Sequence, residues 1–481
     1  MIFNSLTYLI LLFLVVTWYW ILSYKLRLYL IFFSSLIFYG FWKISFIPIL
    51  LFSVIVDWLV SQKIPKASKK KRIYLLFISL STNLGLLFYF KYLIFFAENA
   101  IGLSNYLGAE IDPIILKIIL PLGISFYTFQ TISYTVDVYR GFIKPEKDFI
   151  LFSCYVTFFP QLIAGPILRA KEIIPQFLNR PLFSFDYILS GFRFILFGLF
   201  LKVVLADNLS IFVDTGFAMN IENISAIDVW TLAFLFGFQI YFDFSAYSFI
   251  AIGSARMMGI IIPNNFNFPY ISTSPKDFWQ RWHISLSSWI RDYLYLPLNR
   301  IKVQNRSEGG FSKVFKSKGS IKSLFITWSI MGFWHGANWT FLFWGIYHAI
   351  LVSIYRLMEP KTRNFPSLFK STIGFLITLP LIMLSWIPFR ADSISDSFQM
   401  LIKVVSPIAY TWLGMRENAY LVTFLILICF LLTYFIKKNF LPLLNSSKFV
   451  KIILDITLIM FVTLFVIIFF RSINQFIYFQ F

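Results

Sequence analysis

The chain has 481 residues, of which 59% are hydrophobic, 21% aromatic and only 13% charged. A soluble domain has roughly 45–50% apolar and about 25% charged residues, so this composition excludes a soluble enzyme and predicts an all-α polytopic membrane protein. The formal net charge of +20 comes largely from basic residues in short loops between apolar runs, a pattern that marks cytoplasmic loops and argues against nucleic-acid binding.

Apolar windows long enough to cross a membrane recur along the chain. A hydrocarbon core of about 30 Å needs about 20 apolar residues in one helical pass. The predicted spans lie at about 2–22, 27–42, 44–61, 73–96, 113–136, 184–206, 226–250, 371–389, 419–436 and 451–470. Two more segments, 149–165 and 322–357, are predicted to be embedded, so we expect about 11–12 membrane-spanning or embedded helices.

The charges of the loops predict the orientation. Lys25, Arg27 and the basic run 63–72 flank early spans, whereas the segment 98–112 is acidic. Because basic loops stay in the cytoplasm, the N-terminus is expected outside and the loop 300–322 inside. The first span is expected to be retained, since its apolar run is longer than the core of a signal peptide.

Neither embedded segment fits a simple pass. Segment 149–165 carries Pro160, and counting it as a full pass would move Arg169 to the outer side, so it is expected to be a re-entrant or buried piece. Segment 322–357 would be about 54 Å long as one helix. It is therefore expected to be steeply tilted or broken near Gly336 to Asn338.

No internal repeat is visible, and the chain is expected to form one membrane domain over 1–481. Its N-terminal spans occupy 1–110, a motif-bearing core occupies 120–350, and C-terminal spans occupy 365–481.

The sequence RWHISLSSWIRD, residues 281–292, predicts an amphipathic helix. One arc of the helix is apolar and consists of Trp282, Leu286, Trp289 and Ile290. A helix with Trp anchors and cationic residues is expected to lie in the membrane interface. His283 falls at the edge of the polar arc, either as a hydrogen-bonded residue that orients the helix or as a participant in substrate binding or catalysis.

His335 is predicted to lie deep in the membrane. Lys322 is the last charge before it, and the helical rise of 1.5 Å per residue gives a depth of about 20 Å. Gly332 and Gly336 allow another helix or a ligand to approach closely, and the amide of Asn338 is placed to fix the imidazole tautomer. The residues alone fit either a catalytic base or a hydrogen-bonded core histidine.

His348 follows on a different face of the predicted helix and is interpreted as structural. Neither a His pair four residues apart nor acidic ligands accompany these histidines, so no metal site is expected.

Two other polar clusters interrupt apolar runs. Gln130, Asp137 and Arg140 lie within 121–141, and Asp243 stands between aromatic residues. Charged side chains inside membranes pair internally or line polar cavities, and internal pairing is the expectation for both clusters.

An ordered series of motifs carries a family resemblance. The motifs are PLGISFYTFQTISYTVDVYRG (121–141), FFPQLIAGPILR (158–169), YFDFSAYS (241–248), NFNFPY (265–270), FWQRWHISLSSWIRDYLYLPL (278–298), GFWHGANWTFLFWG (332–345) and the terminal FIYFQF. This series resembles the membrane-bound O-acyltransferase (MBOAT) superfamily and, within it, the alginate O-acetylation branch.

The resemblance implies a ring of helices around a thin central region, with His335 where a cytoplasmic and an outer cavity meet. Catalysis is then expected from His335, supported by His283. Substrate contacts are expected from Asn338, Trp334, Gln130, Asp243, Arg281, Arg291 and Asp292.

The resemblance also implies the reaction and its setting. No cofactor is expected to be bound, and acetyl-CoA is the expected donor on the cytoplasmic side. The acceptor is expected to be an exported polysaccharide such as alginate, reached through an extracytoplasmic acetyltransferase partner. The expected location is a bacterial inner membrane.

Two alternatives remain open. A relative that moves D-alanine from a carrier protein to a cell-wall polymer would share both histidine motifs. A non-enzymatic channel or scaffold for polysaccharide export would not need His335.

The orientation can be tested by labelling single cysteines after Cys154 and Cys429 are removed. Because basic loops are retained inside, cysteines at positions 68 and 312 are expected to stay unlabelled by an impermeant maleimide in sealed cells. A cysteine at position 105 is expected to react. Labelling at position 312 from outside would reverse the predicted orientation.

Overall fold

The computed structural model describes residues 1–112, 118–179, 181–301, 319–362, 365–440, 448–470 and 476–477, and its regular elements are helices. In this part of the chain, eight helical segments are long and apolar enough to cross a membrane. They are Ile44–Lys66, Lys69–Tyr106, Phe185–Phe217, Ala226–Met257, Trp339–Met358, Ser367–Arg390, Glu417–Asn439 and Ile452–Phe469. The prediction of an all-α polytopic membrane protein is confirmed.

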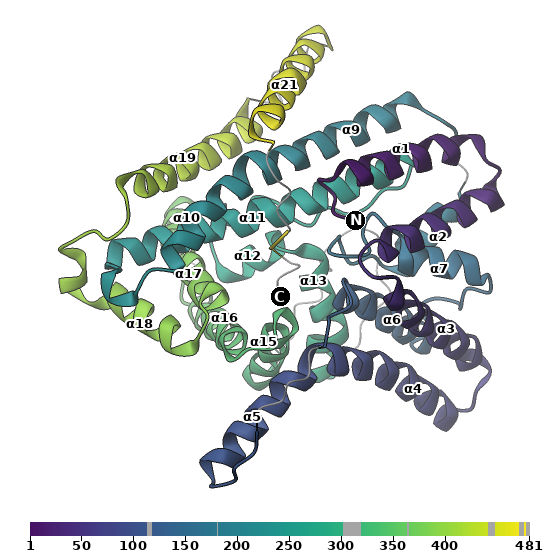
Figure 1. The fold of residues 1–481 in the computed structure, drawn as a ribbon, viewed down its shortest axis with the longest axis horizontal. Helices are drawn as coiled ribbons and strands as arrows, with labels where there is room; N and C mark the ends of the chain where they lie inside the picture. The colour runs from purple at the N-terminus through teal and green to yellow at the C-terminus, as the bar shows by residue number, and fades with distance from the viewer. Residues whose placement is uncertain are drawn as a thin grey trace.

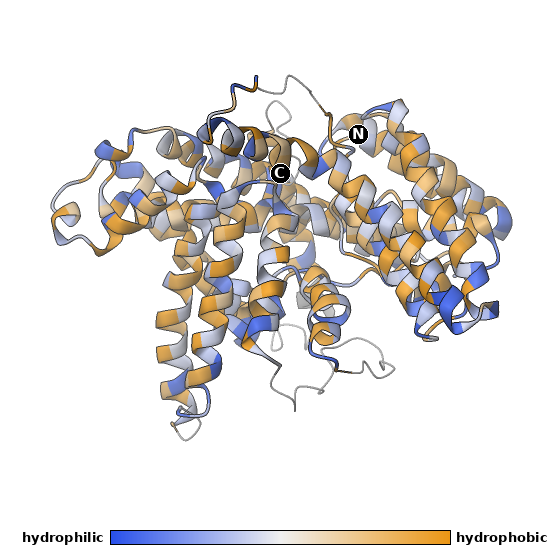
Figure 2. Cartoon of the chain, turned by 90° about the horizontal axis from the view of Figure 1, so that it is seen from below, coloured by the Kyte–Doolittle hydropathy of each residue, from blue (hydrophilic) through white to orange (hydrophobic). Residues whose placement is uncertain are grey.

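Four of the N-terminal helices pack side by side at one edge of the molecule, and the fifth, α5 (Leu93–Tyr106), projects away from them (Figure 1). The four are α1 (Leu6–Ile21), α2 (Tyr24–Gly40), α3 (Ile47–Lys63) and α4 (Lys69–Leu87). A π turn over Phe88–Tyr92 joins α4 to α5 without a break, so the predicted span 73–96 is part of a longer helical segment. Many large apolar side chains on these helices are exposed. Figure 2 shows hydrophobic residues along most of the helical ribbons, with hydrophilic residues mainly near their ends.

The segment 149–165 is buried, as predicted. Its helix α7 (Phe149–Thr157) would span only about 14 Å at 1.5 Å per residue, too short to cross the membrane. The turns that follow it are enclosed by protein and pack against the start of α6 (Ile124–Tyr139). Gly123 is required there because it has φ 75°, and a Cβ would lie 2.7 Å from the Leu162 carbonyl oxygen. The chain then enters α8 (Ala170–Leu178).

Helix α11 (Ala226–Met257) is the central helix, and 89% of its most apolar window is buried. A capping box between Ser225 and Asp228 fixes its start. Helices on both sides cover it (Figure 1). They are α9 (Phe185–Leu199), the π-helical Phe200–Ala206, α10 (Asp207–Phe217), α17 (Ser367–Arg390), α18 (Ile394–Val405) and α19 (Glu417–Asn439). The last long helix, α21 (Lys448–Phe469), packs on α9.

The prediction of one interfacial helix over 281–292 is wrong. Helix α12 (Pro275–Arg281) ends before Trp282, and α13 (Ile284–Ile290) begins after His283, whose φ of 42° lies in the left-handed region. A π turn over Arg291–Tyr295 and α14 (Leu296–Leu298) complete this segment. Both arcs of the supposed helix are largely buried, because neighbouring loops supply hydrogen-bond partners to its polar side chains.

The segment 322–357 is broken, as expected, near Gly336 to Asn338. Helix α15 ends at His335 (Ile321–His335), and α16 begins at Trp339 (Trp339–Met358). The two helices pack closely because glycines face each other. A Cβ on Gly332 would collide with the Phe341 carbonyl oxygen, and one on Gly345 would collide with the Trp328 carbonyl oxygen.

The substitution Gly345→Ala is therefore expected to destabilise the protein by about 1–3 kcal/mol, because the backbone of α15 has to move. The measurement is thermal unfolding of the full chain in detergent, followed by tryptophan fluorescence. Gly85→Ala is the matched control, since a Cβ there meets nothing within 4 Å. Equal unfolding temperatures for the two variants would contradict the packing described for α15 and α16.

Candidate functional site

His335 is the last residue of α15 and is only 4% exposed. Its Nδ1 lies 2.8 Å from the carbonyl oxygen of Met331. A carbonyl oxygen only accepts, so Nδ1 carries the proton and Nε2 carries the lone pair that a base or nucleophile needs. The indoles of Trp334 and Trp344, each with its centroid 4.9 Å from the imidazole, and the ring of Phe389 at 5.4 Å enclose it.

The expectation that Asn338 fixes this tautomer is wrong. The Oδ1 of Asn338 accepts from the Thr340 backbone N–H at 3.1 Å and caps α16. Because the helix breaks after His335, Asn338 begins a new helix instead of continuing the same face. The carbonyl of Met331 takes the orienting role.

His283 is fully buried, and its Nδ1 lies 3.2 Å from Oδ1 of Asn265. The same Oδ1 accepts from the backbone N–H of Ser285 at 3.2 Å and from its hydroxyl at 2.9 Å. This atom is thus an acceptor, so Nδ1 of His283 is protonated and Nε2 has the lone pair. The ring centroids of His283 and Trp334 are 6.3 Å apart, and Trp334 also contacts His335.

Asn265 is a polar partner that sequence reasoning missed. It stands at the start of the motif NFNFPY, which was noticed only as part of the resemblance. The signal that was available is an asparagine that alternates with aromatic residues.

His348 has the opposite tautomer. Its Nδ1 accepts from the indole N–H of Trp279 at 3.3 Å, which leaves the proton on Nε2. His348 is fully buried and shares the contact with Trp344, at 4.7 Å between ring centroids. Its basic nitrogen is already used in a hydrogen bond, which agrees with a structural interpretation.

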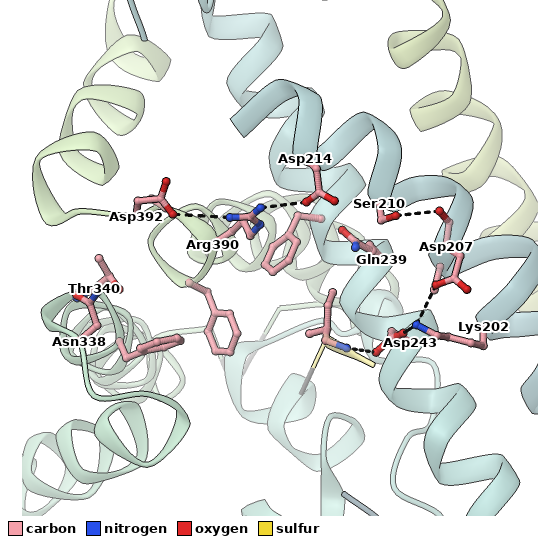
Figure 3. A pocket seen from close by; sticks show the side chains of 16 residues that line it. Lys202, Asp207, Ser210, Asp214, Gln239, Asp243, Asn338, Thr340, Arg390 and Asp392 are labelled. Atoms are coloured by element: carbon pink, nitrogen blue, oxygen red, sulfur yellow. Dashed lines mark hydrogen bonds and ion pairs between the residues drawn. The ribbon is translucent and has the colours of Figure 1, made fainter. Parts of the chain in front are cut away.

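A polar cavity of about 450 Å³ begins at the break between α15 and α16 (Figure 3). Its polar and charged lining residues are Lys202, Asp207, Ser210, Asp214, Gln239, Asp243, Asn338, Thr340, Arg390 and Asp392. Two of the expected substrate contacts, Asn338 and Asp243, are among them. Phe389 also lines this cavity and contacts His335.

The charges of the polar cavity are paired. Lys202 Nζ lies 2.8 Å from Asp207 and 2.7 Å from Asp243, and Arg390 lies 3.0 Å from Asp214. The second oxygen of Asp243 accepts from the backbone N–H of Ile477 at 2.7 Å, which holds residues 476–477 at the cavity wall. The carboxylates and hydroxyls suit a ligand that is rich in hydroxyl groups.

A second cavity, of about 270 Å³, lies on another side of α15. Apolar side chains form most of its wall, including Trp279, Trp328 and Met331. Its charged lining residues are Lys276, Arg291, Arg356 and Glu359. Met331 lines this cavity and its carbonyl accepts from His335, whereas Phe389, which contacts the imidazole, lines the polar cavity. His335 itself lines neither of these two cavities.

A third, small cavity of about 40 Å³ is lined directly by His335 and Trp334. The start of α6, Ile163 and Lys91 complete its wall. Lys91 donates to the carbonyl oxygens of Trp334 at 2.7 Å and His335 at 3.0 Å. Sequence reasoning missed Lys91, although a lysine within a long apolar run is a signal of its own.

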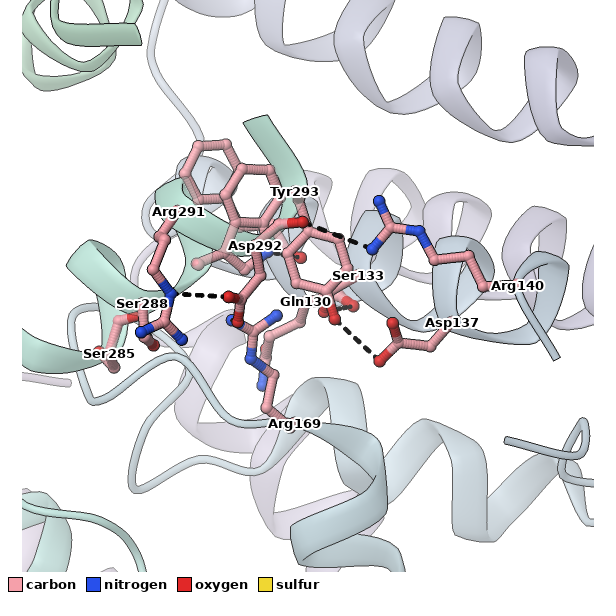
Figure 4. A network of polar contacts seen from close by, with 12 residues as sticks. Gln130, Ser133, Asp137, Arg140, Arg169, Ser285, Ser288, Arg291, Asp292 and Tyr293 are labelled. Atoms are coloured by element: carbon pink, nitrogen blue, oxygen red, sulfur yellow. Dashed lines mark hydrogen bonds and ion pairs between the residues drawn. The ribbon is translucent and has the colours of Figure 1, made fainter. Parts of the chain in front are cut away.

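The remaining expected contacts have protein partners. Asp292 pairs with Arg169 at 3.5 Å and with Arg291 at 2.9 Å in a buried network (Figure 4). Arg281 pairs with Asp277 at 2.8 Å, and Gln130 Oε1 accepts from Gln161 at 3.2 Å. Arg281, Gln130 and Asp292 line none of the three cavities described above, whereas Arg291 lines the second. The expected internal pairing of the 121–141 cluster is confirmed, since Asp137 accepts from Tyr293.

The substitution Asn265→Ala is expected to destabilise the protein by about 1–3 kcal/mol, because it removes the acceptor shared by His283 and Ser285. Thermal unfolding of the full chain measures the loss. Ser288→Ala is the control, since its hydroxyl donates only to the nearby Ser285 carbonyl and little change is expected. An Asn265→Ala protein as stable as Ser288→Ala would refute the role of Asn265.

Comparison with known proteins identifies the family. Residues 78–387 match the MBOAT, membrane-bound O-acyltransferase family. The chain is 35% identical to the peptidoglycan O-acetyltransferase of Helicobacter pylori, over 76% of this chain and 72% of the relative. It is 36% identical to the probable alginate O-acetylase AlgI of Pseudomonas putida, over 79% and 75%. It is 29% identical to the teichoic acid D-alanyltransferase of Bacillus subtilis, over 51% and 61%.

The family match extends over more than half of the chain, and the two acetylating relatives align with about three quarters of it. The chain therefore belongs to the membrane-bound O-acyltransferase family and is a multi-pass membrane acyltransferase.

Proposed function

We propose that the protein transfers an acetyl group from acetyl-CoA for the O-acetylation of an exported polysaccharide such as alginate, in the inner membrane of a bacterium. The observation that carries this proposal is the position of His335. Its Nδ1–H is held by Met331, which lines the cavity with basic side chains, and its ring packs against Phe389, which lines the cavity with carboxylates and hydroxyls.

The second cavity suits the donor. Three basic side chains line it, Lys276, Arg291 and Arg356, against the single carboxylate of Glu359, and this excess of positive charge favours the phosphates of acetyl-CoA. Its apolar wall reaches Met331, beside the catalytic histidine. The polar cavity on the other side suits a saccharide hydroxyl or a hydroxyl of an extracytoplasmic acetyltransferase partner.

His335 then acts as the general base. Its Nε2 accepts the proton of the acceptor hydroxyl while the oxygen attacks the thioester carbonyl carbon. The departing thiolate then receives this proton from Nε2 of His335. His283 supports the site from the far side of Trp334, where its Nε2 is also unprotonated.

Transfer of D-alanine from a carrier protein is a second candidate, because teichoic acid D-alanyltransferases are among the relatives. Acetyl transfer is favoured, since the acetylating relatives reach 35–36% identity over 76–79% of the chain. The D-alanyltransferases reach 29–31% over 51–56%.

The test pairs two conservative variants of the purified full chain in detergent, where both faces are accessible. His335→Gln keeps an N–H for the Met331 carbonyl but lacks a basic nitrogen, so thiol release from acetyl-CoA and transfer of label from [1-14C]acetyl-CoA are expected to fall at least about 100-fold. His348→Gln keeps an acceptor for Trp279 and is expected to stay within a few-fold of wild type. Oligomannuronate and muropeptides are the two acceptors offered.

A folded His335→Gln protein that transfers at the wild-type rate would refute the general-base assignment and favour a channel or scaffold. A D-alanyl carrier protein is supplied in a parallel reaction. If D-alanine is transferred from that carrier and no acetyl group is transferred from acetyl-CoA, the donor is the carrier protein and the proposed donor is wrong. If label enters muropeptides and not oligomannuronate, the acceptor is peptidoglycan and not alginate.

A further inference from the structure

Lys91 is a cation placed directly beside His335. It lies in the π turn between α4 and α5, and its Nζ donates to the carbonyl oxygens of Trp334 and His335 at 2.7 and 3.0 Å. These two carbonyls are its hydrogen-bond acceptors among the described residues. An ammonium group has three N–H donors, so one donor is left for a group that enters the site.

Lys91 has no carboxylate partner in the described part of the chain, in contrast to Lys202. Lys91 is partly buried and Lys202 is fully buried, but Lys202 pairs with both Asp207 and Asp243. A cation at membrane depth costs free energy unless an opposite charge compensates it, and such residues mark functional sites. An anion that forms during a reaction would supply the missing opposite charge.

The space in front of Lys91 has the size for such an anion. Lys91, Trp334 and His335 line the same cavity of about 40 Å³. A single water needs at least about 10–15 Å³ of such space, so the cavity admits a group of a few heavy atoms. The carbonyl group of an acyl thioester is of that size.

We propose that Lys91 stabilises the oxyanion that forms during acyl transfer, an inference that rests on the proposed function. The acceptor oxygen forms a bond to the carbonyl carbon, its proton passes to Nε2 of His335, and the carbonyl π pair becomes a lone pair on oxygen. The ammonium of Lys91 binds this negative oxygen. The pair returns to the C–O bond as the C–S bond breaks, and the thiolate leaves with the proton from His335.

The test compares three variants of the purified full chain. Lys91→Met removes the charge at similar length, and its kcat is expected to fall about 100-fold or more, as for loss of one oxyanion donor. Its KM for acetyl-CoA is expected to stay within about threefold, because the charge acts on the transition state. Lys91→Arg keeps the cation and is expected to recover much of the lost kcat.

Tyr92→Phe is the matched control. Tyr92 lies in the same turn and its hydroxyl donates to the Phe333 carbonyl at 2.9 Å, but it carries no charge. Its kcat is expected to stay within about threefold of wild type. Elution as a single species and an unchanged unfolding temperature show that each variant is folded.

A folded Lys91→Met protein with wild-type kcat would overturn the proposal, as would equal losses for Lys91→Met and Tyr92→Phe. The reactions are run with both acetyl-CoA and the D-alanyl carrier protein, since an oxyanion forms from either thioester. Failure of acetyl-CoA as a donor therefore counts against the proposed function. A kcat that does not change when the charge of Lys91 is removed counts against this inference alone.

Discussion

The site depends on how the carbonyl groups at the end of α15 find hydrogen-bond donors. Hydrocarbon offers no donors, so a helix that ends inside a membrane needs them from neighbouring protein. The π turn between α4 and α5 provides two donor side chains. Tyr92 donates to the carbonyl of Phe333, and Lys91 donates to the carbonyls of Trp334 and His335. The helix break that follows His335 is thus stabilised by a segment more than 200 positions earlier in the chain.

The three histidines differ in which ring nitrogen carries the proton, because different atoms face their Nδ1. Met331 and Asn265 present oxygen acceptors, so His335 and His283 keep the lone pair on Nε2. Trp279 presents a donor, so His348 has its proton on Nε2. Three imidazoles joined through shared indole contacts thereby have different chemical capacities, although all are buried among aromatic rings.

Much of the architecture could be predicted from the sequence, because apolar length and loop charge act locally. The buried piece at 149–165 and the break near Gly336 both followed from length arguments. The helix over 281–292 was predicted wrongly, since a helical wheel assumes a continuous helix and cannot reveal that Asn265 binds Ser285 and His283. A lysine in a long apolar run is visible in the sequence, but the contacts of Lys91 could not be predicted, because its partners lie 243 and 244 positions away.

The bond between Asp243 and Ile477 has a consequence for biosynthesis. The two residues are 234 positions apart. At synthesis rates of about 5–20 residues per second, Ile477 is therefore synthesised roughly 10–50 s after Asp243. Lys202 precedes Asp243 in the chain and binds its other oxygen, so the partner cation of this carboxylate is synthesised before it. The wall of the polar cavity is completed only after residue 477 has been synthesised.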